Sequence, residues 1–122
     1  MEWTVANHEA FEPEYEALPD EVKDALLAQL IRLRAYGPGL GRPQVDTLAG
    51  SEHANMKELR FDAGDGVWRV AFAFDPERKA ILLVAGDKSG VAQKRFYKAL
   101  INKADVRFSE HLEALKGKES KA

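Results

Sequence analysis

The chain has 122 residues, a length that fits one domain with a single core and is too short for two. It contains no cysteine, which excludes a disulfide framework and a thiolate metal site and is compatible with a reducing cytosol. No apolar run reaches the length of a membrane span, and the first residues lack the positive flank of a signal peptide. We therefore expect a cytoplasmic protein with one domain over residues 1–122, frayed from about residue 117.

The net charge of -2 hides an asymmetry along the chain. Residues 1–30 contain eight acidic residues against Lys23 alone, a net charge of -7, so the remainder carries +5. Such a division fits a protein whose later two thirds meet a polyanion while its first helices face solvent or a partner. A solvated acidic helix face explains the N-terminal part at least as well.

The first half of the chain predicts a short strand and two helices. Residues 3–5 favour an opening strand, and residues 13–18 favour one or two helical turns. A clearer helix starts at Pro19, with acidic residues in its first turn, and ends in the glycine and proline of residues 36–39. Four apolar residues recur in it at helical spacing: Val22, Leu26, Leu30 and Leu33. Residues 40–51 are predicted to form a polar connection.

The second half predicts a three-stranded meander and a late helix. Residues 56–61 and 67–74 are joined by a glycine-rich hairpin signal. Residues 80–86 are apolar on both faces, which indicates a central strand covered on both sides. Residues 91–115 return to helical spacing. Their expected buried stripe is Phe96, Leu100, Ala104, Phe108, Leu112 and Leu115.

The register of the hairpin follows from placing its large apolar side chains on one face. These side chains are Trp68, Val70, Phe72 and Phe74 on one strand, with Phe61 opposite Trp68 and Leu59 opposite Val70. Arg60 then lies opposite Arg69 on the other face, which we expect to be open. Two like charges across a ladder are unfavourable, so the pair suggests an anion between them. Ala71 and Ala73 would continue that face as a shallow groove.

A plainer interpretation of this face stays open. Glu58 lies on it and could pair with either arginine in an ordinary solvated salt bridge. Other chemistries have less support, because the three histidines show no metal-ligand spacing and the chain has no phosphate-binding loop, dinucleotide fingerprint or nucleophile elbow. What remains is a group of cations suited to electrostatic work on phosphate, namely Lys57, Arg60, Arg69 and Lys88.

Three segments carry a resemblance to a known family. The runs His53–Arg60, Trp68–Phe72 and Ile81–Ser89 read as Lys-Glu-Leu-Arg, then aromatic-Arg-Val, then an apolar strand that ends in lysine. In this order they resemble the RelE/ParE toxin superfamily, specifically its HigB-like, phage-derived branch, over nearly the whole chain. The resemblance implies an α+β fold of RelE type, an antiparallel sheet with an N-terminal strand, two N-terminal helices, a three-stranded meander and a C-terminal helix.

The resemblance also implies a function. The implied function is that of the toxin of a type II toxin-antitoxin pair. Such a toxin is a metal-independent mRNA endoribonuclease that needs no cofactor and inhibits translation, in many relatives on the ribosome. Its partners would be mRNA and a helix-turn-helix antitoxin, with operator DNA reached only through the antitoxin and no membrane. Two alternatives remain, a ParE-like inhibitor of DNA gyrase and an inactive antitoxin-binding co-repressor module. Ribosome dependence is open as well, because many ribosome-dependent relatives are strongly basic and this chain is slightly acidic.

Site residues carry over by position in the matched motifs. The catalytic set would be Lys57, Arg60, Arg69 and Lys88, and the RNA-binding set His53, Arg95 and Tyr97. A 2′-hydroxyl would attack phosphorus while the arginines hold the phosphorane charge. Lys57 would be the base and Lys88 would serve the leaving oxygen, although these roles can be exchanged. The plainer alternatives are that Tyr97 packs and that Lys57 snorkels at a strand end.

Overall fold

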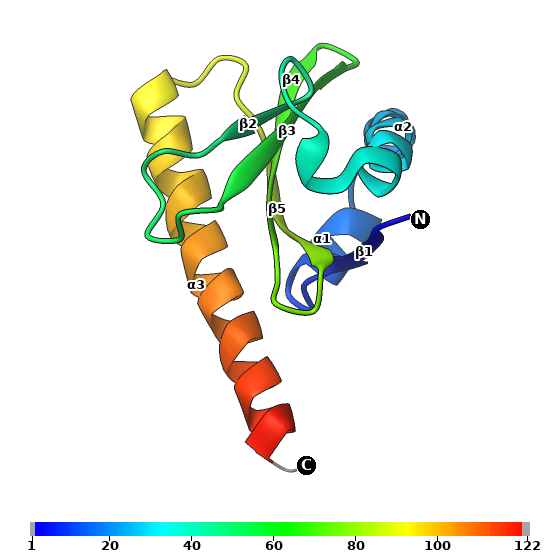
Figure 1. Cartoon of the computed structure of the whole chain (residues 1–122). Coiled ribbons are helices and arrows are strands. Elements are labelled where there is room, and N and C mark those ends of the chain that lie inside the picture. The colour runs from blue at the N-terminus through cyan, green and yellow to red at the C-terminus, as the bar shows by residue number, and fades with distance from the viewer. Residues whose placement is uncertain (1, 121–122) are drawn as a thin grey trace.

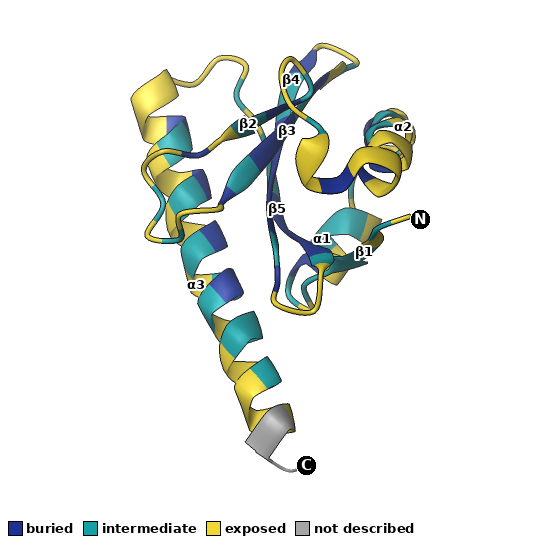
Figure 2. Cartoon of the chain, viewed as in Figure 1, coloured by how far each residue is buried: buried dark blue, intermediate teal, exposed yellow. Residues whose placement is uncertain are grey.

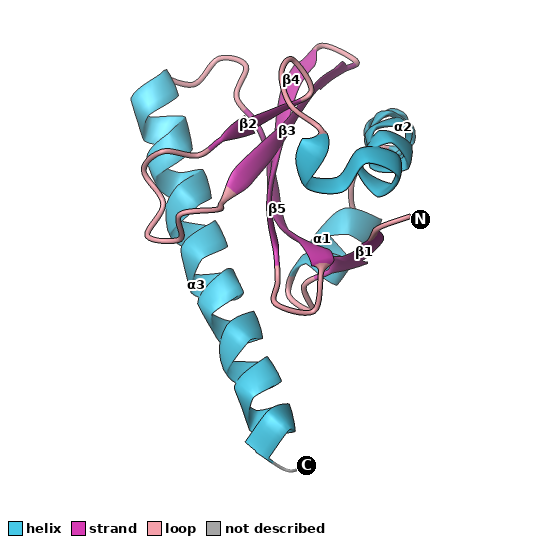
Figure 3. Cartoon of the chain, viewed as in Figure 1, coloured by secondary structure: helices cyan, strands magenta, loops and turns pink. Residues whose placement is uncertain are grey.

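The structure, a computed structural model, describes residues 2–120. In chain order its elements are β1 (Thr4–Asn7), α1 (Phe11–Glu16), α2 (Asp20–Tyr36), a 3₁₀ turn η1 (Gly37–Gly39), β2 (Val45–Thr47), β3 (Lys57–Ala63), β4 (Gly66–Phe74), β5 (Lys79–Asp87) and α3 (Gln93–Ser120). The sheet lies between α1 and α2 on one side and α3 on the other (Figures 1 and 3). No helix within residues 2–120 combines the length and apolarity needed to cross a membrane.

The five strands form one sheet in the order β1-β5-β4-β3-β2. The predicted register of the hairpin is confirmed, with Arg60 opposite Arg69 and Phe61 opposite Trp68. The α+β class is confirmed too, but the sheet is mixed, because β1 runs parallel to β5 while the other neighbours are antiparallel. The short strand β2 falls in the segment predicted as a polar connection and pairs with the start of β3.

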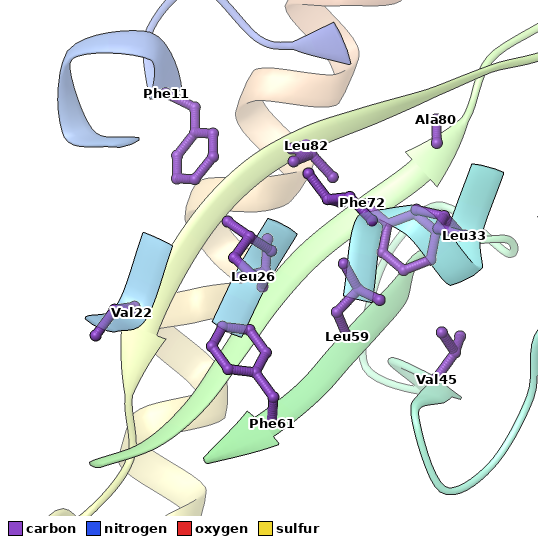
Figure 4. Packing of buried hydrophobic residues seen from close by; sticks show 12 residues of the cluster. Phe11, Val22, Leu26, Leu33, Val45, Leu59, Phe61, Phe72, Ala80 and Leu82 are labelled. Carbon is purple, nitrogen blue, oxygen red and sulfur yellow. The ribbon is translucent and has the colours of Figure 1, made fainter. Parts of the chain in front are cut away.

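Helix α2 covers one face of the sheet, and its predicted apolar stripe is confirmed. Val22, Leu26, Leu30 and Leu33 are all buried. Figure 4 shows three of them facing large side chains of the sheet, among them Phe72 and Leu82. Burial of one such side chain stabilises the fold by about 1.5–3 kcal/mol. This cluster fixes the position of the sheet against the N-terminal helices.

Helix α3 covers the other face, so the expected open face with a shallow groove is wrong. Ala71 and Ala73 are fully buried beneath Phe96, Leu100, Ala104 and Phe108. The small side chains let the helix approach the sheet closely. Gly86 acts in the same way, since a Cβ atom there would lie 2.9 Å from the Phe96 ring.

The far part of α3 extends beyond the sheet and is largely exposed (Figure 2). Leu112 and Leu115, the last residues of the predicted stripe, are half-buried. The helix continues to Ser120, past the point where the sequence predicted a frayed tail, and residues 121–122 lie outside the described part.

Candidate nucleic-acid interface

The two facing arginines are each neutralised by a carboxylate of the protein itself. Arg69 Nε lies 3.4 Å from Glu58 Oε1, and the two side chains are only 7% and 8% exposed. Arg60 Nη1 lies 3.9 Å from Asp46 Oδ2 on β2. The like-charge pair in the ladder therefore needs no external anion, and the expectation of an anion between the two arginines is wrong.

Tyr97 closes a network around the buried arginine. Its hydroxyl donates to Glu58 Oε1 at 2.7 Å and accepts a hydrogen bond from Arg69 Nε at 3.2 Å. Arg69 Nη1 donates to the Trp68 carbonyl at 2.8 Å. Burial, together with the bond to Glu58, raises the pKa of Tyr97 above its usual 10.0, so the phenol keeps the proton that it donates. The network connects α3 to the middle of the sheet.

In this network Arg69 and Tyr97 have a structural role. A buried carboxylate and guanidinium must satisfy each other, because an unpaired charge in the interior is costly. The suggestion that Tyr97 packs rather than stacks on RNA agrees with its contacts, which include the edge of the Phe96 ring.

Arg60 is more accessible than Arg69, with 35% of its side chain exposed. Its carboxylate partner Asp46 is shared with Arg42, whose Nη2 lies 3.1 Å from Asp46 Oδ2. The hydrogen bond from Arg42 is the main cause that lowers the pKa of Asp46. Arg60 can therefore turn towards a phosphate while Arg42 continues to balance Asp46.

Lys57 does not join the arginines. It is paired with Phe72, which packs on the α2 side, whereas Glu58 and Arg60 point to the α3 side. Phe72 pairs in turn with Leu82, which precedes Lys88, the residue directly after β5, by six residues, or about 20 Å along a strand. Lys57 and Lys88 thus lie at opposite ends of the sheet and cannot serve one scissile phosphate as base and acid.

Lys88 lies in a turn that is stabilised by hydrogen bonds. Its backbone N–H donates to the Val67 carbonyl at 2.9 Å, which places it two residues along β4 from Arg69. Asp87 Oδ1 accepts from the N–H groups of Val67 and Ser89 and from the Ser89 hydroxyl. The Ser89 hydrogen bonds are the first cause that lowers the pKa of Asp87. Among the described residues, Lys88 has no ion pair.

The predicted RNA-binding residues also separate into two places. Arg95 is exposed on the first turn of α3, close in sequence to the Lys88 turn. His53 Nε2 lies 3.0 Å from Ser109 Oγ, and its ring meets the Phe108 ring edge-on. Ser109 is 14 residues beyond Arg95 on the same helix, about 21 Å along its axis. His53 connects the loop before β3 to α3 through these contacts and lies far from Arg95 and Lys88.

Apart from Lys57, three cations of the predicted set are at least partly exposed: Arg60 on β3, Lys88 directly after β5 and Arg95 on the first turn of α3. We call these three residues the basic set. The carboxylate partners of the arginine pair were only partly visible in the sequence. Glu58 could be recognised by its shared face with the arginines, whereas Asp46 lies on a strand too short to show a pattern. Within residues 2–120, no three histidine or acidic side chains are grouped as metal ligands would be.

Comparison with known proteins identifies the family. Residues 13–109 match the family of phage-derived Gp49-like proteins (DUF891). Two proteins of Mycobacterium tuberculosis strain H37Rv are similar in sequence. The candidate toxin HigB2 is 43% identical over 111 residues, which are 90% of this chain and 54% of that protein. The candidate toxin HigB3 is 53% identical over 75 residues, which are 62% of this chain and 63% of that protein.

The chain thus spans roughly half to two thirds of the length of these relatives. In fold it is similar to a solved structure of the E. coli toxin RelE, a double arginine-to-alanine mutant in the free state. The TM-score is 0.56 at 14% identity, and the match covers 84% of this chain and 97% of that one. The predicted resemblance to HigB-like proteins of RelE fold is confirmed, and the chain belongs to the phage-derived Gp49-like family.

Proposed function

We propose that this chain is the toxin of a type II toxin-antitoxin pair and acts as an endoribonuclease on mRNA. Three findings support the proposal: membership of the Gp49-like family, relatives named as HigB toxins, and a RelE-like fold. The observation that carries it is the placement of Lys88, a cation without an ion pair among the described residues. Its backbone is hydrogen-bonded to Val67, which lies two residues before Arg69 on β4. Its partner would be a helix-turn-helix antitoxin.

The proposed reaction uses the basic set. A ribose 2′-hydroxyl attacks the adjacent phosphorus in line, and the 5′-oxygen leaves. Arg60 holds the negative charge of the phosphorane with its planar fork of donors. Lys88 protonates the leaving oxygen, Arg95 binds a neighbouring phosphate, and the 2′-proton passes to solvent. Arg69 and Tyr97 act as positioning residues, because they connect α3 to the strands that bear the cations.

Growth arrest in bacteria tests the class of target. The chain is induced without a partner, and incorporation of labelled methionine and thymidine is followed together. An early fall of methionine incorporation supports a block of translation. An early fall of thymidine incorporation would favour the gyrase-inhibitor alternative, and normal growth would favour the inactive co-repressor.

The chemistry is tested separately on purified protein. RNA cleaved through its 2′-hydroxyl carries a 2′,3′-cyclic phosphate or a 3′-phosphate on the upstream fragment. Cleavage should persist in EDTA and should fail on a substrate with 2′-deoxyribose at the scissile position. Both reactions are run in parallel with and without ribosomes. Cleavage of the deoxy substrate would refute the mechanism. Loss of RNA cleavage in the presence of the chelator would refute it as well, even if the protein is a nuclease.

A further inference from the structure

The outward face of α2 carries apolar side chains that the rest of the chain leaves exposed. Leu27 is 47% exposed, and Ile31, four residues later on the same face of the helix, is 69% exposed. Ala28 and Ala35 are exposed beside them, and their small side chains leave room for a close neighbour. A row of apolar side chains on one face of an exposed helix is the arrangement through which helices pack on one another.

This face repeats at the spacing of a coiled coil. Asp24, Leu27, Ile31 and Arg34 follow one another at intervals of three, four and three residues, which is the alternation of the a and d positions of a heptad. Asp24 and Arg34 are exposed, and neither forms an ion pair among the described residues. The helix dipole acts within the first and last turns, so it accounts neither for Asp24 nor for the apolar pair.

The row is complementary to itself in the antiparallel direction. When two α2 helices pair about a two-fold axis at the level of residue 29, Leu27 of each copy lies level with Ile31 of the other. Asp24 of each copy then lies level with Arg34 of the other, so that one ion pair forms on either side of the apolar centre. A parallel pairing would instead place Asp24 beside Asp24 and Arg34 beside Arg34, which is unfavourable. A two-fold contact of this kind closes after two copies.

We propose that two copies of this chain form a dimer through α2, paired antiparallel by Asp24, Leu27, Ile31 and Arg34. Two apolar layers on a helix about 26 Å long make a small interface, so the dimer is weak and depends on protein concentration. Helix α2 covers the side of the sheet opposite α3, so the dimer leaves the α3 side of both copies free (Figure 1). The inference goes beyond RNA cleavage and does not depend on it.

Sedimentation velocity of the full chain at increasing concentration measures the association. The expected result is a reversible equilibrium between monomer and dimer. Leu27→Gln/Ile31→Gln should weaken the association by at least about tenfold. The melting temperature should stay close to that of the wild type, because both side chains are exposed. The matched control Val106→Gln removes an apolar side chain that is 61% exposed on α3 and should dimerise normally.

Charge reversal tests the two ion pairs. Asp24→Arg alone and Arg34→Asp alone each place like charges on both sides of the apolar centre, so each variant should be monomeric where the wild type is a dimer. An equal mixture of the two variants should recover the dimer, because each copy then meets the opposite charge. The double variant Asp24→Arg/Arg34→Asp should recover it as well, since the charges are exchanged and remain complementary.

Spin labels measure the direction of pairing. The chain has no cysteine, so Glu21→Cys and Arg32→Cys each provide a unique attachment site at an exposed position of α2. In the antiparallel dimer the two labels at residue 32 are separated by about 9 Å along the helix axis, and the two at residue 21 by about 24 Å. A parallel dimer would give both pairs of labels the same separation.

Three results would overturn the proposal. They are a chain that stays monomeric at every concentration, a dimer that Leu27→Gln/Ile31→Gln leaves intact, and equal label separations at residues 21 and 32. If the wild type is monomeric and Leu27→Gln/Ile31→Gln escapes neutralisation by the antitoxin, the face belongs to the antitoxin and not to a second copy.

Discussion

Arg60 and Arg69 lie directly opposite each other on β3 and β4, yet they differ in burial and in partner. Arg69 is enclosed with Glu58 and Tyr97 beneath α3, whereas Arg60 is partly exposed and shares Asp46 with Arg42. Of this cross-strand pair, Arg69 is a buried structural residue and Arg60 is partly accessible to a ligand. The difference predicts that mutation of Arg69 lowers the stability of the fold much more than mutation of Arg60.

Arg69→Ala should destabilise the fold strongly. It leaves the buried Glu58 carboxylate without its cation, a loss of about 3–5 kcal/mol for a buried pair. Arg60→Ala should change stability by about 1 kcal/mol or less, since its ion pair is partly exposed. Urea unfolding of both variants measures the two effects. Equal stability of the two variants would mean that the Glu58–Arg69–Tyr97 network contributes little.

Tyr97→Phe should remove both hydrogen bonds of the hydroxyl and cost about 2 kcal/mol. The pKa of Tyr97 is raised in the folded state, so its contribution is complete below pH 10.0 and is lost as the pH rises through the folded-state value. The stability difference between the wild type and Tyr97→Phe should therefore shrink above about pH 10. Tyr36→Phe, at a residue that is 65% exposed, is the control and should match the wild type throughout.

Much of the fold could be predicted because local patterns determine it. The end signals of α2 were sufficient for the boundaries of that helix, and the alternation in β3 and β4 was sufficient for the register and the facing arginines. The parallel pairing of β1 was not predictable, because its partner strand lies more than 70 residues away. Nor was β2, whose three residues carry no period.

The candidate site was harder to predict, because alternation shows which residues share a face and not what covers that face. Ala71 and Ala73 were interpreted as the floor of an open groove, but small residues on a sheet also mark the close approach of a helix, and α3 lies there. The apolar pattern of β5 already indicated cover on both sides, and the same cover extends to β4. Lys57 was misplaced for a simpler reason, since alternation places it on the opposite face from Arg60.

Glu14→Gln should make the free energy of unfolding of the chain less dependent on pH in the acidic range. Arg107 Nη1 donates to Glu14 Oε1 at 2.9 Å, and this hydrogen bonding lowers the pKa of Glu14. A carboxyl group with a lowered pKa stabilises the fold above its ordinary value of 4.5, and the contribution disappears as the pH falls. Unfolding measured from pH 7 to pH 3 should show wild type and variant converging on acidification. Parallel curves would contradict the prediction, and Glu2→Gln at an exposed position is the control.

Lys88→Ala should abolish growth arrest without loss of stability, whereas Lys57→Ala should leave growth arrest intact. Lys88 lies on the turn that approaches the arginine row, and Lys57 lies on the other face at the far end of the sheet. Each side chain is only partly buried and neither forms an ion pair in the described part of the chain, so their removal should change the melting temperature equally little. Induction of both variants from one promoter, with protein levels checked by immunoblot, compares them directly. Toxicity that depends on Lys57 and not on Lys88 would move the reactive centre to the β2–β3 end of the sheet and would refute the assignment of the leaving-group proton to Lys88.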